Sequence, residues 1–284
     1  MTTKDVVTLE RSDNSSCKIH VFGATLYSWI NKGEEMIFVS SKSHFDKKKA
    51  IRGGIPIVFP NFGPWDLGPQ HGFARIMSWN STEVSKDESS NPMAVFNLSD
   101  TEETRKMWNF RHVSWITFQL TYIVTLLEDS LKTDFIVKNV DDKQLGFTCL
   151  LHNYFKVPDV TKVTVSGLNG LRYKDKVRGG EMFTENGELV TVSENIDRIY
   201  QDTPSEHILK QVAGGCSIVI TKTELPDTVV WNPWKENAAS MSDFGDDEYP
   251  QMLCVEAGFV AKQKVLASDE KYMGSQRLTV KQVV

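Results

Sequence analysis

The sequence lacks any long apolar run, since no stretch approaches the roughly 18 consecutive apolar residues that a membrane-spanning helix needs. Its first residues lack the apolar core and cleavage site of a secretory signal. It also lacks an excess of positive charge: 32 basic and 37 acidic residues give a net charge of −5. A broad nucleic-acid surface is therefore disfavoured, although a small basic pocket is not. We expect a cytoplasmic protein with neither a membrane nor a nucleic-acid partner.

Cysteine is scarce, and the short motifs of several enzyme classes are missing. The four cysteines show no C-x-x-C spacing, so we expect free thiols in a reducing compartment. The sequence has no H-E-x-x-H, G-x-S-x-G, Walker A or G-x-G-x-x-G motif. Its six histidines are scattered without ligand spacing, at positions 20, 44, 71, 112, 152 and 207. These absences predict a protein without a metal or another cofactor.

What the sequence does contain is a period of two along most of its length. Apolar, β-branched and aromatic residues alternate with polar ones in a dozen or more short segments, which is typical of a large β-sandwich or barrel. We expect strands at 17–29, 36–40, 74–84, 93–98, 118–127, 133–140, 145–157, 162–166, 217–221, 228–231, 252–260 and 277–283, with a turn or bulge at Gly23. Helical turns are expected only at 102–107 and 235–241. No repeat or linker divides the chain, so we predict one all-β domain over residues 1–284.

Two long segments are poor in strands. Residues 52–75 are rich in proline and glycine, and residues 231–250 mix aromatic with acidic side chains. Long irregular segments inside a compact domain are usually functional or disordered. Because these contain several tryptophans and phenylalanines, disorder is disfavoured, and we expect ordered binding loops.

Two titratable residues interrupt otherwise apolar strands. His152 follows Leu150 and Leu151, on the face shared by Thr148, and could be a hydrogen-bonded core histidine or a proton donor. Glu256 is the one carboxylate of 252–260; an unpaired buried carboxylate is costly, so Glu256 is either ion-paired or faces a cleft as a proton acceptor. Gly258, on the same face, would leave space for a ligand.

The strand-poor segments supply cationic residues. Arg52 precedes a glycine pair where backbone could approach a ligand closely, and Gln70, His71 and Arg75 lie within six positions. Arginine suits bidentate capture of phosphate or carboxylate, although each arginine taken alone could equally form a surface salt bridge. Asp197 taken alone reads as a solvated loop acid or a partner of its neighbouring arginine.

Taken together, six motifs resemble the glucose-6-phosphate 1-epimerases (hexose-6-phosphate mutarotases) of the aldose 1-epimerase superfamily. They are Arg52-Gly-Gly-Ile-Pro, Gln70-His-Gly-Phe-Ala-Arg75, Leu151-His-Asn-Tyr-Phe155, Asp197-Arg-Ile-Tyr200, Val230-Trp-Asn-Pro-Trp234 and Cys254-Val-Glu-Ala-Gly258. They occur in the family's order along nearly the whole chain. The resemblance implies a large antiparallel β-sandwich of the galactose mutarotase type.

The resemblance also implies roles for individual residues. His152 stands at the general-acid position and Glu256 at the general-base position. Arg52, Gln70 and Arg75 match substrate contacts, with the arginines near the phosphate, and Asp197 matches a carboxylate that binds sugar hydroxyls. His71 and Trp231 are pocket residues without an assigned role.

The implied activity is cofactor-independent interconversion of the α and β anomers of hexose 6-phosphates, by a monomer whose partner is a small sugar phosphate. Two alternatives stay open from the residues. One is a sugar-phosphate-binding protein without activity on the same fold. The other is a carbohydrate hydrolase or lyase that uses Asp197 and Glu256 as its carboxylate pair.

Overall fold

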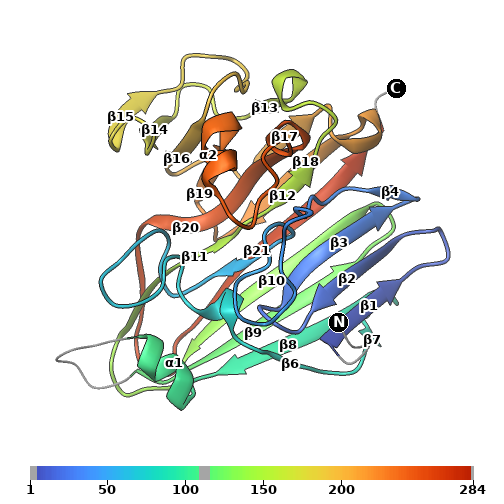
Figure 1. The fold of residues 1–284 in the computed structure, drawn as a ribbon. Helices are drawn as coiled ribbons and strands as arrows, with labels where there is room; N and C mark the ends of the chain where they lie inside the picture. The colour runs from blue at the N-terminus through green and yellow to red at the C-terminus, as the bar shows by residue number, and fades with distance from the viewer. Residues whose placement is uncertain (1–4, 109–115, 283–284) are drawn as a thin grey trace.

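The computed structural model describes residues 5–108 and 116–282, and its regular secondary structure consists mainly of antiparallel strands in three sheets (Figure 1). The first sheet has the order β1-β2-β3-β4: Val6–Glu10, Ser16–His20, Thr25–Asn31 and Glu34–Glu35. The second has the order β13-β17-β18-β21-β10-β9-β8-β6, with β7 also paired to β8. The third has the order β15-β14-β16-β19-β20-β11-β5, with β12 also paired to β20.

The strands of the two large sheets have the following bounds. In the second sheet they are β13 (Thr164–Ser166), β17 (Glu206–Lys210), β18 (Ser217–Thr223), β21 (Lys271–Lys281), β10 (Ser130–Asn139), β9 (Phe118–Leu126), β8 (Pro92–Ser99), β6 (Asn80–Ser81) and β7 (Ser85–Lys86). In the third they are β15 (Glu181–Thr184), β14 (Arg172–Asp175), β16 (Ile196–Tyr200), β19 (Asp227–Asn232), β20 (Met252–Leu266), β11 (Leu145–Leu151), β5 (Ile57–Val58) and β12 (Tyr154–Lys156).

The main hydrophobic core lies between the two large sheets. Successive strand residues point to opposite faces, so one apolar face of each large sheet turns inward. The buried ring of Phe59 shows this contact, because its centroid lies 6.1 Å from that of Phe135 on β10 and 5.4 Å from that of Phe147 on β11. On the other face of the third sheet, smaller buried clusters form around Leu150 and Val229 and around Tyr154 and Cys254. That other face is where the loops gather.

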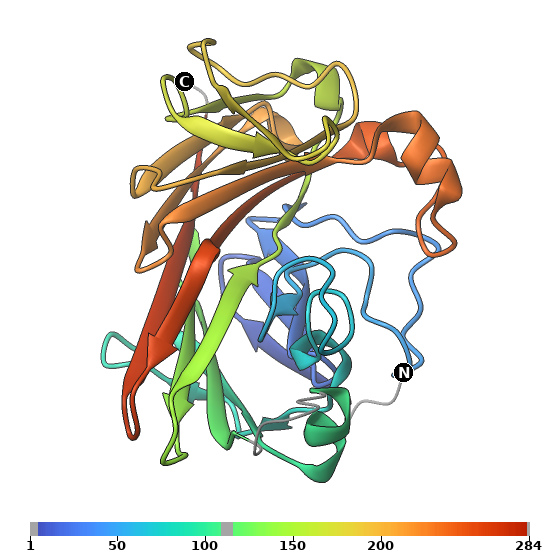
Figure 2. The same ribbon diagram turned by 90° about the vertical axis from the view of Figure 1, so that its left-hand side faces the viewer.

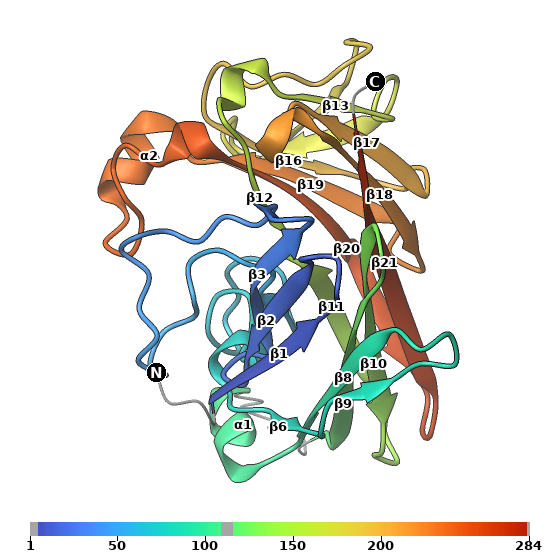
Figure 3. The same cartoon turned by 90° about the vertical axis from the view of Figure 1, so that its right-hand side faces the viewer.

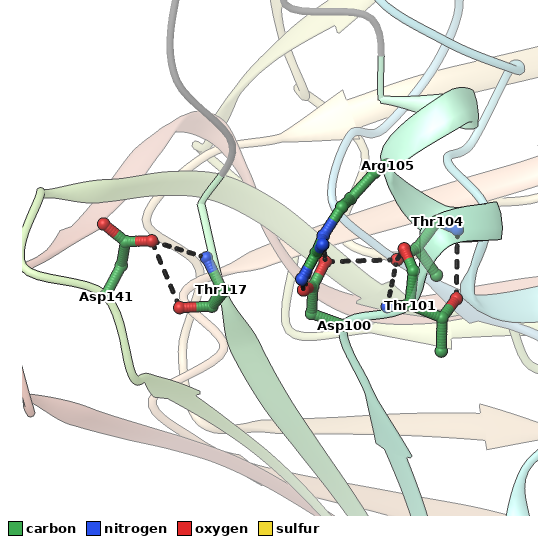
Figure 4. A network of polar contacts seen from close by, with 6 residues as sticks. All are labelled: Asp100, Thr101, Thr104, Arg105, Thr117 and Asp141. Atoms are coloured by element: carbon green, nitrogen blue, oxygen red, sulfur yellow. Dashed lines mark hydrogen bonds and ion pairs between the residues drawn. The ribbon is translucent and has the colours of Figure 1, made fainter.

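Helical structure is sparse, as predicted. The α-helices are α1 (Glu102–Met107) and α2 (Trp234–Ser240), and short 3-10 turns span Ala74–Ile76, Val160–Lys162, Ala213–Gly215 and Tyr249–Gln251. Thr101 caps α1 by accepting a hydrogen bond from the Thr104 backbone N–H, and Arg105 pairs with Asp100 (Figure 4). In the same view the Asp141 carboxylate accepts a 2.9 Å bond from the backbone N–H of Thr117, which ties the start of β9 to the end of β10.

The loops of the N-terminal third and helix α2 lie on the same side of the long strands β20 and β21. Figure 2 shows this arrangement, and the opposite view in Figure 3 agrees with it. No helix of the described residues is long and apolar enough to cross a membrane. All four cysteines are free and buried, as expected.

Most of the predicted strands are confirmed, and the turn at Gly23 is confirmed by a φ of 74° between β2 and β3. Residues 36–40 are wrong as a strand, because they form only isolated bridges, Ile37 with Phe155 and Val39 with Gly53. Residues 74–84 are also wrong: they begin with a 3-10 turn and keep only the two-residue β6. The prediction for 145–157 misses a break at His152 and Asn153, and Val283, the predicted end of the last strand, lies outside the described residues.

Two glycine interpretations are corrected by the structure. Gly53 and Gly54 have φ values of 122° and 76°, and an added Cβ would lie 2.5 Å or less from the backbone of Phe38 or Leu26. This pair therefore lets the chain approach its own backbone, not a ligand. At Gly258 an added Cβ would meet Cys149 O and the Leu150 side chain at 3.0 Å, so the space beside this glycine is filled by β11.

Candidate active site

One pocket brings together every site residue predicted from the sequence. Its volume is about 310 Å³, at the small end of the range for ligand pockets, which suits a monosaccharide-sized ligand. The predicted residues that line it are Arg52, Gln70, His71, Arg75, His152, Asp197, Trp231 and Glu256. Four further lining residues are Phe62, Lys176, Val229 and Met241. The two strand-poor segments contribute much of this lining, in agreement with their interpretation as ordered binding loops.

The floor of the pocket follows from the register of four adjacent strands. Asp197 on β16 stands opposite Trp231 on β19, and Trp231 stands opposite Cys254 on β20. Two residues along, Val229 stands opposite Glu256. His152 follows the last residue of β11, the next strand of the sheet. Side chains two apart on a strand share a face, so the sheet itself brings these residues together although they are up to about a hundred positions apart in sequence.

His152 and Glu256 form a buried pair at this floor. Their relative exposures are 8% and 1%, and His152 Nδ1 lies 3.6 Å from Glu256 Oε2. That separation is too long for a direct hydrogen bond, and neither atom has another hydrogen-bond partner among the described residues. Buried polar atoms are nearly always satisfied in folded proteins. Two unsatisfied atoms facing each other at a pocket therefore point to a bound group that would satisfy them.

The surroundings shift the pKa values of this pair in opposite directions. Burial lowers the pKa of His152 well below its ordinary value, and the positive charges of Arg75 and Arg52 lower it further. Burial raises the pKa of Glu256 well above its ordinary value, and the Asp197 carboxylate adds to this. When the pair holds one proton in the empty pocket, that proton therefore resides on Glu256 and His152 is neutral.

Aromatic rings hold the imidazole of His152 in place. The ring of Tyr154 stacks on it at 4.7 Å with an interplanar angle of 11°, and Trp231 meets it edge-on at 5.9 Å. His71 contacts the same imidazole at 5.9 Å, and its own Nδ1 accepts a 3.2 Å hydrogen bond from the Gly63 backbone N–H. A neutral His71 consequently carries its proton on Nε2.

The two arginines differ in their partners. The Arg52 guanidinium donates to Tyr154 Oη at 3.2 Å through Nη1, and its Nη2 lies 3.1 Å from the carboxylate of Asp243. Arg75 donates at 2.7 Å to the backbone carbonyl of Gln70, and none of the described carboxylates forms an ion pair with it. The Nε atoms of both arginines are buried and without a hydrogen-bond partner in the described part of the chain. Both arginines line the pocket, and Arg75 has no carboxylate partner among the described residues, so the pocket offers positive charge to an anion.

Sequence reasoning missed three contributors to the site. Lys176 follows β14 and forms an ion pair with Asp197 at 2.8 Å, so Asp197 is not paired with its neighbour Arg198. Burial raises the pKa of Asp197, and Lys176 opposes this shift. Asp243 and Tyr154, the partners of Arg52, were also missed. Each of the three acts through a contact between residues far apart in sequence, although Tyr154 does lie inside a quoted motif.

Spacing along the sequence suggested no metal-ligand cluster, but the fold brings three possible ligand residues together. The ligand atoms of His152, Cys254 and Glu256 all lie within 4.8 Å of one another, and all three residues are buried. Spacing along the chain could not reveal this group, because β20 supplies two members and the end of β11 the third.

Comparison with known proteins gives a family match and several similar proteins. The family model described as aldose 1-epimerase matches residues 5–279. A protein of Cenchrus ciliaris named "Putative glucose-6-phosphate 1-epimerase" is 36% identical over 274 residues, which cover 94% of this chain and 82% of the relative. A protein of Escherichia coli with the same name is 30% identical over 262 residues, covering 91% of this chain and 84% of the relative.

Solved structures give the same result for the fold. The crystal structure of a "putative mutarotase" from Salmonella typhimurium superposes with a TM-score of 0.87 at 26% identity, covering 99% of this chain and 92% of the other. Galactose 1-epimerase from Lactobacillus acidophilus superposes with a TM-score of 0.74 at 15% identity, covering 98% and 95% of the two chains. The antiparallel β-sandwich of the galactose mutarotase type, expected from the sequence motifs, is therefore confirmed.

Proposed function

Since this chain belongs to the aldose 1-epimerase family, we propose that it interconverts the α and β anomers of hexose 6-phosphates, with glucose 6-phosphate as the preferred substrate. The observation that carries the proposal is the composition of one small pocket. A buried carboxyl–imidazole pair lies on its floor, and two arginines with unsatisfied N–H groups line it. The first feature suits proton transfer at the sugar ring, and the second suits a phosphate monoester.

The chemistry requires one proton acceptor and one proton donor. Ring opening breaks the bond between C1 and the ring oxygen, while a base removes the proton of the C1 hydroxyl and an acid protonates the ring oxygen. The resulting aldehyde rotates about the C1–C2 bond and closes on its other face, which returns both protons. No electron transfer or group transfer occurs. Each well-placed proton-transfer group supplies about 10²–10⁴-fold in rate.

We assign these roles to Glu256 as base and His152 as acid. The reacting form then has an ionised Glu256 and a protonated His152. It holds the same number of protons as the form favoured in the empty pocket, where the proton is on Glu256 and His152 is neutral. Binding therefore has to move one proton within the pair, not take one from solvent. A dianionic phosphate near Arg52 and Arg75 would offset the cationic charges that oppose protonation of His152.

The remaining lining residues have positioning roles in this proposal. Arg52 and Arg75 hold the phosphate, and Gln70 and the Asp197–Lys176 pair bind sugar hydroxyls. Trp231 and Tyr154 keep the imidazole oriented. Because the phosphate is remote from C1, its binding energy serves to orient the reacting carbon, and the phosphate takes no part in breaking the ring bond.

The test is two-dimensional exchange NMR on the anomeric protons of glucose 6-phosphate. The protein at catalytic concentration should raise the α–β exchange rate above the spontaneous rate, and more for glucose 6-phosphate than for glucose or galactose. A boiled sample is the matched control. If exchange is accelerated for none of these sugars while the folded protein still binds glucose 6-phosphate, the protein is a sugar-phosphate-binding protein and the catalytic proposal is wrong.

A further inference from the structure

Cys254 has no part in the proposed reaction and does not line the pocket, yet it lies next to two residues that do, His152 and Glu256. It stands two residues before Glu256 on β20, so the two side chains share a face of the sheet. Its thiol lies within 4.8 Å of ligand atoms of both His152 and Glu256. Cys254 is fully buried, in a cluster with Tyr154, and Trp231 packs against that cluster.

The three donors suit one class of ion. Imidazole nitrogen, thiolate sulfur and carboxylate oxygen together are a donor set typical of Zn²⁺, which binds them at about 2.0–2.3 Å. Those bond lengths place neighbouring ligand atoms about 3.4–3.7 Å apart at a tetrahedral ion. The 3.6 Å between His152 Nδ1 and Glu256 Oε2 already has this length, and the sulfur lies within 4.8 Å of ligand atoms of both residues. Mg²⁺ and Ca²⁺ prefer oxygen ligands and are disfavoured here.

A second observation points to a ligand at this place. His152 Nδ1 and Glu256 Oε2 are buried atoms without a hydrogen-bond partner among the described residues, and both residues line the pocket. A metal ion bound by them would have three protein ligands and a fourth position open toward the pocket, as in open zinc sites.

The local charges explain why the thiol is needed. Arg52, Arg75 and Lys176 line the same pocket, and Asp197 and Asp243 offset only part of their charge. A bare divalent cation would be repelled there. A thiolate from Cys254 and a carboxylate from Glu256 balance both charges of the ion, and two protons, one from the thiol and one from the Glu256 carboxyl, leave to solvent when the ion binds. Without the thiolate, the bound ion would add a positive charge to a cationic pocket.

We propose that His152, Cys254 and Glu256 form an inhibitory zinc site. Zinc bound there would occupy the lone pairs that the proton transfers use, so metal binding and anomer exchange exclude each other. The metal site itself rests only on the geometry of the three side chains, whereas the inhibition also rests on the proposed function.

The experiment measures metal binding and activity separately on the full-length protein. Co²⁺ replaces Zn²⁺ as a spectroscopic probe, because a thiolate ligand gives it a charge-transfer absorption in the near ultraviolet. One equivalent of Co²⁺ should produce this band, and added Zn²⁺ should abolish it. In the exchange assay on glucose 6-phosphate, buffered Zn²⁺ should inhibit, EDTA should restore the rate, and Mg²⁺ should have no effect.

Cys254→Ser is the decisive variant and Cys216→Ser its matched control, since Cys216 is also buried but does not belong to the group of three ligand residues. Cys254→Ser should keep its exchange activity, lose the Co²⁺ band and need at least tenfold more Zn²⁺ for half-inhibition, because losing a ligand costs no less than the 10–100-fold typical of lost supporting contacts. Cys216→Ser should behave as the wild type. Cys254→Ala replaces the serine variant if that variant does not fold.

Equal zinc sensitivity of Cys254→Ser and the wild type, or a wild type without the Co²⁺ band, would overturn the zinc site. A one-to-one Co²⁺ complex with the thiolate band but unchanged exchange activity would support the site and overturn its inhibitory role, together with the roles of His152 and Glu256 in catalysis.

Discussion

Replacing Arg75 tests whether the pocket selects phosphorylated sugars. Arg75 is the better of the two arginines for this purpose, because Arg52 already has an ion pair with Asp243 and a hydrogen bond to Tyr154. Removing Arg52 would leave those partners unsatisfied. Burial, together with the charge of Arg52, lowers the pKa of Arg75 to about 10, so Arg75 is still cationic at neutral pH. We therefore expect Arg75→Met to remove a charge that a bound phosphate would neutralise.

The expected magnitude follows from the contact that is lost. A hydrogen bond to a charged group contributes about 1.5–3 kcal/mol, and each 1.36 kcal/mol is a factor of ten. The ratio of kcat/KM for glucose 6-phosphate to that for glucose should therefore fall by about 10–150-fold. The value of kcat/KM for glucose should not fall, because glucose has no phosphate and loss of the Arg75 charge makes protonation of His152 easier. Arg75→Lys should give a smaller loss, since it keeps the charge without the planar fork.

Anomer-exchange NMR on both sugars gives the ratio for each variant. The matched control is Arg172→Met, since Arg172 is exposed on β14 of the same sheet and does not line the pocket. Circular dichroism verifies the fold of each variant. A wild-type ratio near one, or a ratio that Arg75→Met leaves within about twofold of wild type, would refute the phosphate-binding role and leave an epimerase of free aldoses.

Three further predictions concern the buried pair. Glu256→Gln and His152→Asn should each lower the exchange rate by about 10²–10⁴-fold at an unchanged circular dichroism spectrum; near-normal exchange in either folded variant would contradict the assigned roles. The dependence of kcat/KM on pH should be bell-shaped. At low pH the pair takes up a second proton and loses its base, and at high pH it gives up its one proton and loses its acid. Measuring the profile on both glucose and glucose 6-phosphate separates titration of the pair from titration of the phosphate, and a flat profile on both sugars would count against the pair. Finally, because the pKa of Glu256 is raised by folding, the carboxyl favours the folded state below its unfolded pKa of about 4.3 and loses this contribution as the pH rises. The melting temperature of Glu256→Gln relative to wild type should thus increase from pH 4 to pH 8 in thermal unfolding, and a constant difference would show that folding does not raise the pKa of Glu256.

Much of the fold could be predicted because the core strands alternate strongly. The segments that became β8, β9, β10 and β18 alternate between an apolar and a more polar face, so their periods were plain in the sequence. The segment of β20 was recognised by its apolar residues on both faces. The errors arose where alternation occurs without a pairing strand. Residues 74–84 alternate, but Ala74 and Arg75 lie in a 3-10 turn. Strands β14 and β15 were missed because polar and exposed residues dominate them.

The residues of the site could also be predicted only in part, because some of them are recognised only by contacts between distant segments. Glu256 and His152 could be identified because a titratable side chain on an apolar strand demands an explanation. Lys176 and Asp243 carry no such signal, since a charged residue in a polar segment is usually solvated. Their roles depend on the register that places Lys176 beside Asp197 and on the loop after α2 that brings Asp243 to Arg52. Cys254 looked like an ordinary apolar strand residue until the strand end carrying His152 was placed beside it.

If Arg52 binds the substrate phosphate as proposed, its ion pair with Asp243 makes phosphate binding an exchange of anions. In the empty pocket the Asp243 carboxylate already holds Nη2 of the guanidinium. A phosphate that takes this position would displace the Asp243 carboxylate from the Arg52 guanidinium and would not bind an unpaired guanidinium. Glu248 anchors the far end of the loop that carries Asp243 by accepting hydrogen bonds from the hydroxyl of Ser40 and the backbone N–H of Ser41. An unphosphorylated sugar has no anionic group to replace the carboxylate, so it would leave the ion pair between Arg52 and Asp243 intact.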